Sequence, residues 1–109
     1  MKITLYQVLS HEKIEASVSG DTITVNGEAI DLSVIPDGYR LPATAVNNPW
    51  FVAGSYVDRV DGHLSITLRF PVEWDSPEEV RAPETPIILD VKSGPVKFPS
   101  VEPVENDQP

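Results

Sequence analysis

The sequence of 109 residues contains no cysteine, which excludes disulfides and thiolate metal sites as sources of stability. Bases are scarce as well, since eight basic side chains face seventeen acidic ones and the formal net charge is -9. Because such a charge repels a polyanion, it argues against direct binding to nucleic acid. No apolar run reaches the length of a membrane span, and residues 1–7 show no secretion signal. We therefore expect a soluble, unsecreted protein with no membrane partner, in a compartment that is reducing or whose redox state does not matter to the fold.

Acidic residues and prolines concentrate in the last third of the chain. Residues 73–109 hold nine acidic and three basic side chains, together with seven of the eleven prolines. Since each proline fixes φ and removes a backbone donor, a continuous helix is not expected there. After Phe98 the sequence has no hydrophobic periodicity that offsets the entropy of ordering. We predict a single β domain over residues 1–98 and an acidic, proline-rich tail over residues 99–109.

Three dipeptides typical of two-residue hairpin loops lie between apolar runs, namely Asn26-Gly27, Asp61-Gly62 and Ser93-Gly94. A loop of this length fixes which residues pair, and a sensible register keeps the apolar side chains on one face. The resulting pairs are Ile23 with Ile30, Val57 with Ile66, Val91 with Val96, Leu89 with Phe98, and Asp90 with Lys97. All three registers meet the condition, so we predict three hairpins.

Further strands are expected over residues 2–9, which are rich in β-formers, and over residues 14–18, where apolar and polar residues alternate. The connection over residues 33–49 is long, and Pro42 favours a brief helix that runs through Val46. Several short strands with no amphipathic helix predict an all-β fold. The architecture we expect is a small antiparallel sandwich or open barrel of about three hairpins, with at most one short helix.

The sequence offers little that is typical of catalysis. It has no cysteine nucleophile, no phosphate-binding glycine loop, no Gly-x-Ser-x-Gly elbow and no His-Glu-x-x-His pair. Asp58, Asp61 and His63 form the nearest metal-binding pattern, but Asp61 already serves an Asp-Gly turn and the register turns His63 outward. His11 has no identifiable partner for general-base work. We expect no enzyme activity, no cofactor and no metal.

Two groups of side chains are candidates for partner binding. The aromatic candidates are Trp50, Phe51 and Trp74, because large aromatic residues are enriched at interfaces, although Trp50 and Trp74 also suit the core of a small β fold. The acidic candidates are Glu78, Glu79 and Glu84. These carboxylates fit a solvated face, a docking strip for a basic partner, or a surface that imitates phosphates.

The central run Trp50-Phe51-x-x-Gly54-x-x-Val57-x-Arg59-x-Asp61-Gly62-x-Leu64-x-Ile66-Thr67-Leu68-x-x-Pro71 resembles a family of short proteins of tailed bacteriophages and prophages, often encoded in the tail and tail-fibre region. Similarity continues in Asp21-Thr22-Ile23-Thr24-Val25-Asn26-Gly27-Glu28, Ala82-Pro83-Glu84 and Gly94-Pro95-Val96-x-Phe98-Pro99. The resemblance implies a virion component or tail-assembly accessory without catalytic residues. It also implies location in the bacterial host cytoplasm during assembly, and then in the virion tail.

Our main hypothesis is therefore a structural or interaction protein that binds another phage tail or tail-fibre protein. The alternative is an acidic phage-encoded inhibitor that imitates phosphate or DNA and occupies a host defence or nucleic-acid-binding protein. A third hypothesis is a carbohydrate-binding module in which Trp50, Trp74 or Tyr56 stacks on sugar rings. A homo-oligomer is a further option, with the first strand as its contact if that strand lies unpaired at an edge.

Overall fold

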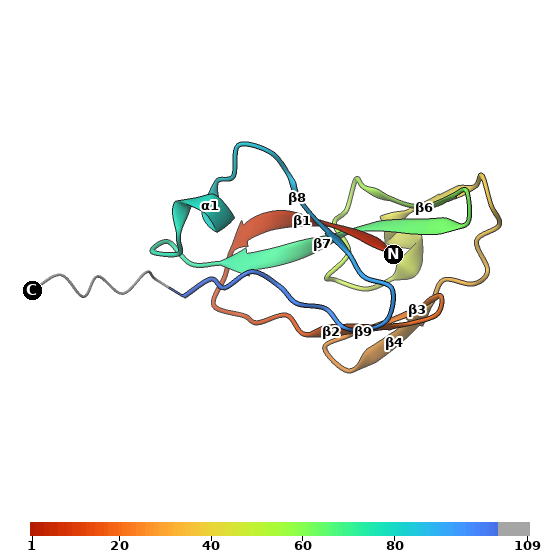
Figure 1. Cartoon of the computed structure of the whole chain (residues 1–109), viewed down its shortest axis with the longest axis horizontal. Helices are drawn as coiled ribbons and strands as arrows, with labels where there is room; N and C mark the ends of the chain where they lie inside the picture. Colours follow the sequence, from red (N-terminus) through yellow and green to blue (C-terminus); the bar gives the residue numbers. More distant parts are fainter. Residues whose placement is uncertain (103–109) are drawn as a thin grey trace, which may run out of the picture.

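Two β-sheets pack face to face in the computed structural model, which describes residues 1–102 (Figure 1). One sheet has the strand order β5-β6-β7-β1-β8 and the other has the order β4-β3-β2-β9. The strands are β1 (Lys2–Leu9), β2 (Ala16–Ser19), β3 (Thr22–Val25), β4 (Glu28–Asp31), β5 (Arg40–Pro42), β6 (Tyr56–Val60), β7 (His63–Val72), β8 (Ile87–Asp90) and β9 (Gly94–Pro95). The expected all-β class and sandwich-like architecture are confirmed.

Two of the three predicted hairpins form with the predicted register. In the β3–β4 hairpin, Ile23 lies opposite Ile30, and the loop residues Asn26 and Gly27 have φ angles of 47° and 88°. In the β6–β7 hairpin, Asp61 and Gly62 have φ angles of 50° and 79°. Two successive positive φ angles define the turn type whose twist matches that of the flanking strands, and asparagine, aspartate and glycine adopt it at least cost.

The hairpin predicted at Ser93-Gly94 is wrong. Before this turn, β8 pairs with β1 in the five-stranded sheet, whereas β9 after the turn pairs with β2 in the other sheet. The predicted partners separate accordingly, because Leu89 lies opposite Ile3, while the ring of Phe98 stacks on Phe70 at 6.0 Å. The strands β8 and β9 therefore do not pair with each other. Each one forms an edge strand, β8 of the five-stranded sheet and β9 of the four-stranded sheet.

A third tight hairpin joins β2 to β3 through Gly20 and Asp21, a turn that the sequence analysis did not anticipate. Ser19 pairs with Thr22, and Gly20 has a φ angle of 60°. Glycine at the first central position permits this turn without steric cost. Residues 1–102 therefore contain three tight hairpins, but one of them differs from the predicted set.

Strand β1 lies in the middle of its sheet, between β7 and β8. It runs parallel to β7, with Ile3 opposite Ile66 and Leu5 opposite Leu68, and antiparallel to β8. The possibility that the first strand forms an open edge is therefore wrong. The sheet also departs from the purely antiparallel arrangement we expected, because the long connection between β1 and β7 allows a parallel pair.

Two single turns of helix interrupt the connections. The 3-10 turn η1 (Ala43–Val46) follows Pro42 as predicted, and Asn47 ends it in the left-handed region with a φ angle of 57°. The turn α1 (Glu78–Arg81) was not predicted, and it follows Pro77 in the same way. Val80 of α1 is buried, which explains how so short a helix holds its position on the fold.

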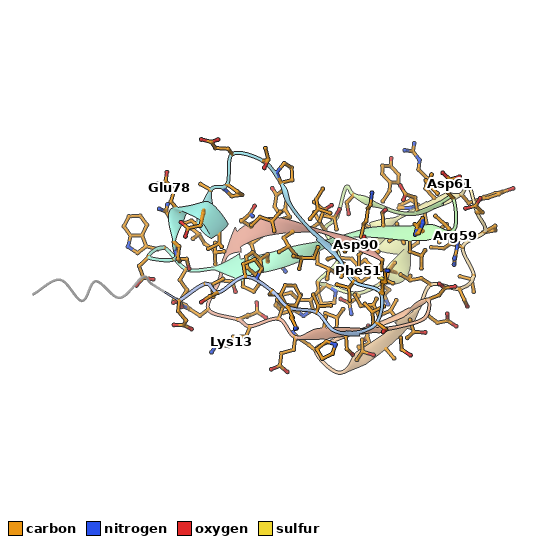
Figure 2. All side chains as sticks on the ribbon, viewed as in Figure 1. Lys13, Phe51, Arg59, Asp61, Glu78 and Asp90 are labelled. Atoms are coloured by element: carbon orange, nitrogen blue, oxygen red, sulfur yellow. The ribbon has the colours of Figure 1, made fainter. Side chains whose placement is uncertain are left out.

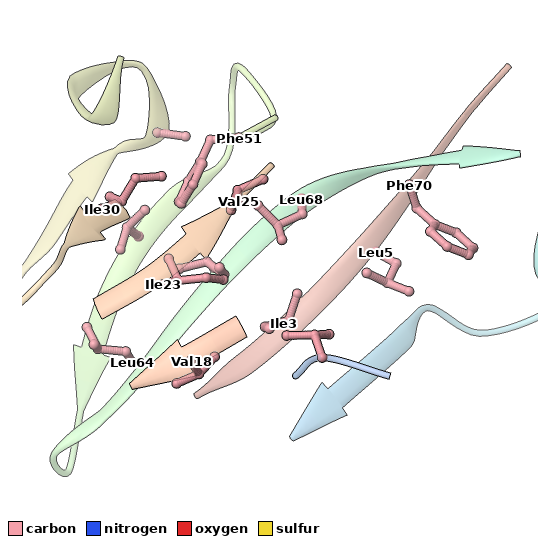
Figure 3. Packing of buried hydrophobic residues seen from close by; sticks show 14 of the residues in the cluster. Ile3, Leu5, Val18, Ile23, Val25, Ile30, Phe51, Leu64, Leu68 and Phe70 are labelled. Carbon is pink, nitrogen blue, oxygen red and sulfur yellow. The ribbon is translucent and has the colours of Figure 1, made fainter. Parts of the chain in front are cut away.

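The core lies between the two sheets, where their apolar faces meet (Figure 3). The five-stranded sheet contributes buried aliphatic side chains from β1, β6 and β7, and the four-stranded sheet contributes others from β2, β3 and β4. Connections between strands add the remaining apolar contacts. The buried hydrophobic residues are Ile3, Leu5, Val18, Ile23, Val25, Ile30, Leu32, Ile35, Ala43, Phe51, Val57, Leu64, Ile66, Leu68, Phe70, Val72, Val80 and Val96.

Arg59 connects the two sheets at the end of the sandwich that contains Asp61 (Figure 2). Its side chain is only 14% exposed, and its Nη2 atom lies 3.0 Å from a carboxylate oxygen of Asp21, in the β2–β3 turn. The Nε atom also donates to the carbonyl of Ile35 at 2.7 Å. Arg59 therefore links the two sheets. Its guanidinium forms an ion pair with Asp21 and donates a hydrogen bond to the backbone of the buried residue Ile35, so its charge is already partnered within the fold.

The first residues of the predicted tail contact the domain. The hydroxyl of Ser76 donates to the carbonyl of Val101 at 2.7 Å, and the side chain of Val101 packs against the core. Residues 103–109, which make up the rest of the predicted tail, lie outside the described residues. The part of the chain that packs on the β domain thus extends beyond Phe98, at least as far as Val101.

Candidate functional site

The predicted aromatic contact residues occupy different environments. Phe51 is only 5% exposed and forms a bridge to Leu68 of β7, so it belongs to the core. Trp50 is half-buried and packs against the same core. Trp74, by contrast, is 80% exposed. Of the three predicted aromatic residues, only Trp74 therefore presents most of its surface to a partner.

The burial of Phe51 follows from how its loop is fixed. The side-chain oxygen of Asn48 accepts the backbone N–H of Trp50 at 2.8 Å, and the amide of Asn48 donates to a carboxylate oxygen of Glu28 at 2.7 Å. The backbone N–H of Arg69 donates to the carbonyl of Trp50 at 2.8 Å. These bonds attach the loop to both sheets and direct Phe51 inward.

Trp74 lies in a tight turn that follows β7. The backbone N–H of Ser76 donates to the carbonyl of Glu73 at 3.1 Å, and the N–H of Glu73 donates to the Ser76 hydroxyl at 2.9 Å. The carboxylate of Glu73 also lies 2.7 Å from Nδ1 of His11, whose side chain is exposed. Since the turn is fixed at both of its ends, the exposed indole is held out from the fold by a defined backbone.

The predicted acidic residues come together next to this turn. Glu78 and Glu79 lie on α1, at the end of the sandwich opposite Asp61 (Figure 2), and both side chains are exposed. With Glu84 they line a shallow hollow of about 400 Å³. We call Trp74, Glu78, Glu79 and Glu84 the acidic end surface.

The carboxylates of the acidic end surface have no cationic partner in the described part of the chain. The ion pairs found within residues 1–102 involve Met1 with Asp90, His11 with Glu73, and Arg59 with Asp21. Arg81, in the last turn of α1, directs its Nε atom to the carbonyl of Ser76 at 3.3 Å. The negative charge of this surface is therefore available to a basic partner.

Asp31 is a carboxylate whose environment shifts its ionisation. Hydrogen bonds from the side chain and the backbone N–H of Ser33 hold the pKa of Asp31 below its ordinary value, and the backbone bond measures 2.9 Å. A lowered pKa favours folding above the ordinary titration range of aspartate, and this contribution is lost as the pH falls through the folded pKa. Asp31 ends β4 and stabilises the turn that follows, so its role is local.

The metal-binding pattern considered from the sequence does not assemble. No group of three or more His, Cys, Asp or Glu side chains within residues 1–102 is placed to hold an ion. Asp61 occupies its hairpin turn with a positive φ angle, and His63 is exposed on the outer face of the sheet. Both residues therefore have the structural roles that the register indicated.

One surface groove was missed by the sequence analysis. It has a volume of about 640 Å³, and its lining includes Tyr6, Thr44, Asn47 and Arg69. Tyr6 and Arg69 lie side by side because β1 and β7 pair in parallel, with these two residues opposite each other. No local sequence signal specifies a parallel partner about 60 residues away, so this adjacency could not be read from the sequence.

Within residues 1–102, no helix has the length and apolar character that a membrane crossing requires. Comparisons of the chain with protein-family models, with curated proteins and with solved structures found no match. The resemblance to the phage proteins therefore stays a prediction.

Proposed function

We propose that this chain is a protein-binding domain that performs no chemistry, and that its partner is another phage tail or tail-fibre protein. The observation that carries the proposal is the exposure of Trp74, a residue that is 80% accessible and lies between Glu73 and Asp75 in the chain. Tryptophan is the residue type most enriched among side chains that dominate interface energies. The phage context comes from the sequence resemblance alone.

The surroundings of Trp74 support a role in recognition. Its turn is fixed by hydrogen bonds to Ser76, so a partner that buries the indole does not have to order the backbone first. Glu78, Glu79 and Glu84 surround a hollow on the same surface and have no cationic partner among residues 1–102. The matching partner has an apolar pocket for the indole and a basic rim.

Trp74→Ala is the variant that tests this proposal. We expect at least an approximately 30-fold rise in Kd for the tail partner, since hot-spot aromatic residues contribute about 2 kcal/mol or more. The matched control is Tyr39→Ala, because Tyr39 is also a largely exposed aromatic residue, at 65%. Tyr39 follows Asp37 by two residues, and the carboxylate of Asp37 accepts the backbone N–H of Gly62 in the β6–β7 turn. Tyr39 therefore lies at the opposite end of the sandwich from Trp74.

The measurement is a pull-down with the tail and tail-fibre proteins encoded beside this chain, followed by calorimetric titration of any partner captured. Retention of wild-type affinity by Trp74→Ala, or equal losses in the two variants, contradicts a binding role for Trp74. Absence of any tail partner, together with absence of the protein from purified virions, contradicts the proposed partner class.

The acidic end surface also favours a second candidate function, an inhibitor that presents carboxylates where a host protein binds phosphates. Glu78, Glu79 and Glu84 supply three charges around one hollow, and none of them forms an ion pair with another residue of the described range 1–102. On this alternative, binding to a basic host protein weakens steeply with salt. Prolines at positions 83 and 86 interrupt the acidic segment, which makes a regular array of phosphate-like charges less favourable.

The triple variant Glu78→Gln, Glu79→Gln, Glu84→Gln separates the two functions. Loss of long-range attraction is expected to slow association with a tail partner, while most of the affinity remains with Trp74. The inhibitor hypothesis predicts the reverse, with binding abolished in the triple variant and nearly unchanged in Trp74→Ala. Association rates measured at several salt concentrations distinguish these patterns.

A further inference from the structure

We propose that two copies of this chain associate through the open edge of β8, which pairs in antiparallel orientation with β8 of the second copy. Ile88 of one copy then lies opposite Ile88 of the other, and the two five-stranded sheets become continuous. This inference does not depend on the proposed function, because Trp74 takes no part in the contact.

The hydrogen bonding of β8 to β1 determines which backbone groups are free. The amino group of Met1 donates to the carbonyl of Val91 at 2.8 Å, and the N–H of Val91 donates to the carbonyl of Met1 at 2.9 Å. In an antiparallel pair, residues that exchange both bonds alternate with residues whose N–H and C=O point away. Counting back from Val91, the backbone groups of Asp90 and Ile88 therefore face outward, away from β1.

Ile88 gives this edge an accessible apolar side chain, between the partly buried Ile87 and Leu89. Ile88 is 56% exposed, and a hollow of about 340 Å³ next to the strand is lined by Ile88, Leu89, Asp90 and Val91 on one side and by Pro95 and Lys97 on the other. Pro95 belongs to β9, the edge of the opposite sheet. Space for an incoming strand thus exists on the side where the sandwich is open.

The other sheet edges are less suited to pairing. At the far end of the same sheet, β5 has three residues and ends in Pro42. In the second sheet, β4 carries Glu28 and Asp31, and β9 has two residues, one of which is proline. Proline and charged side chains are devices that protect edges from pairing, whereas β8 carries three aliphatic residues in succession, Ile87, Ile88 and Leu89, before its one charged residue, Asp90.

Charge and hydrophobicity select one register among the symmetric ones. Centring the two-fold axis on Asp90 sets two aspartates opposite each other, and centring it on Leu89 sets Ile88 opposite Asp90. Centring it on Ile87 sets Glu84 opposite Asp90. Centring it on Ile88 pairs Ile88 with itself and Ile87 with Leu89, and it brings Glu84 toward Lys92 of the second copy. Only this last register combines aliphatic pairs with opposite charges, so a second copy is the occupant that fits the edge.

Single-cysteine variants test both the contact and its register, because the natural chain contains no cysteine. In the proposed register, the Cα atoms of the two residues at position 88 lie about 5.5 Å apart, within the range for a disulfide. Under mild oxidation, Ile88→Cys is therefore expected to form a covalent dimer. The matched control is Asp90→Cys, on the same outer face of the strand, since the two residues at position 90 are separated by about 13 Å along the strands.

The natural chain provides the second measurement. A contact of four residues per copy buries little surface, so we expect weak association, visible as a rise in mass from one chain to two between about 10 and 500 µM in light scattering after gel filtration. Ile88→Lys is expected to raise the dimer dissociation constant at least tenfold, because lysine on an edge strand opposes pairing. Circular dichroism verifies that each variant folds.

Several outcomes overturn the inference. If the natural chain is still a monomer at about 500 µM, the proposed dimer does not form. If Ile88→Cys and Asp90→Cys crosslink equally, the disulfides result from random collision and the proposed register is wrong. A dimer that persists unchanged in Ile88→Lys places the contact elsewhere. Because Trp74 lies outside the contact, Trp74→Ala is expected to dimerise normally. The dimer can therefore be tested even if the proposed binding of a tail partner through Trp74 is wrong.

Discussion

Replacing Arg59 with methionine is expected to lower the free energy of unfolding by about 3 kcal/mol. The substitution keeps an unbranched side chain, but it leaves the carbonyl of Ile35 without its 2.7 Å donor and the carboxylate of Asp21 without its ion-pair partner. The carbonyl of Leu32 loses the 3.4 Å contact with Nη2 and keeps only its bond from the backbone N–H of Ile35 at 3.2 Å. Ile35 and Leu32 are both buried, so water does not readily replace these bonds.

Urea denaturation followed by tryptophan fluorescence measures this loss. Arg69→Met is the matched control, since Arg69 lies on the neighbouring strand and, among residues 1–102, its side chain hydrogen-bonds only to the carbonyl of Pro49, at 3.4 Å. We expect that control to change stability by less than about 0.5 kcal/mol. Similar effects of the two substitutions imply that the cross-sheet contact of Arg59 contributes little.

Phe51→Ala is expected to destabilise the fold by about 3 to 4 kcal/mol, because it removes a buried ring from between the sheets and leaves a cavity. Phe51 is 5% exposed and contacts β7 through its bridge to Leu68. The contrasting variant is Trp74→Ala, whose lost side chain is 80% exposed and should change stability by less than about 0.5 kcal/mol.

Thermal and urea denaturation of the two aromatic variants therefore distinguish a core residue from a contact residue. If Phe51→Ala unfolds at the same urea concentration as the natural chain, the position of Phe51 in the core is wrong. If Trp74→Ala is the less stable of the two, Trp74 has a structural role instead of a binding role. Neither result depends on knowing the partner.

Local turn chemistry explains why much of the fold could be predicted. Asn26-Gly27 and Asp61-Gly62 adopt the positive φ angles that these dipeptides favour, and the alternation of apolar residues then fixes the strand register. Ser93-Gly94 has a similar local signal, yet its flanking strands join different sheets. A turn signal specifies a change in direction, but it does not specify the strand next to which the chain continues.

The candidate site was predictable only in part, for a related reason. Glu78, Glu79 and Glu84 are close in the sequence, so their common surface follows from the sequence itself. The different burial of Phe51 and Trp74 depends on tertiary bonds such as those of Asn48 and Ser76, which composition does not reveal. The same limit applies to the open edge of β8, which depends on the tertiary strand order that places β8 last in its sheet, with β1 as its one neighbour.

The central position of β1 has a consequence for how the protein folds during synthesis. Leu9 pairs with Val72, so about 60 further residues must be translated before this strand meets β7, a delay of about 3 to 12 s at typical elongation rates. During that interval a segment rich in β-formers has neither neighbour, because β8 is synthesised later still. We consequently expect the protein to fold slowly for its size, and we expect chaperones to bind the nascent chain while β1 is unpaired.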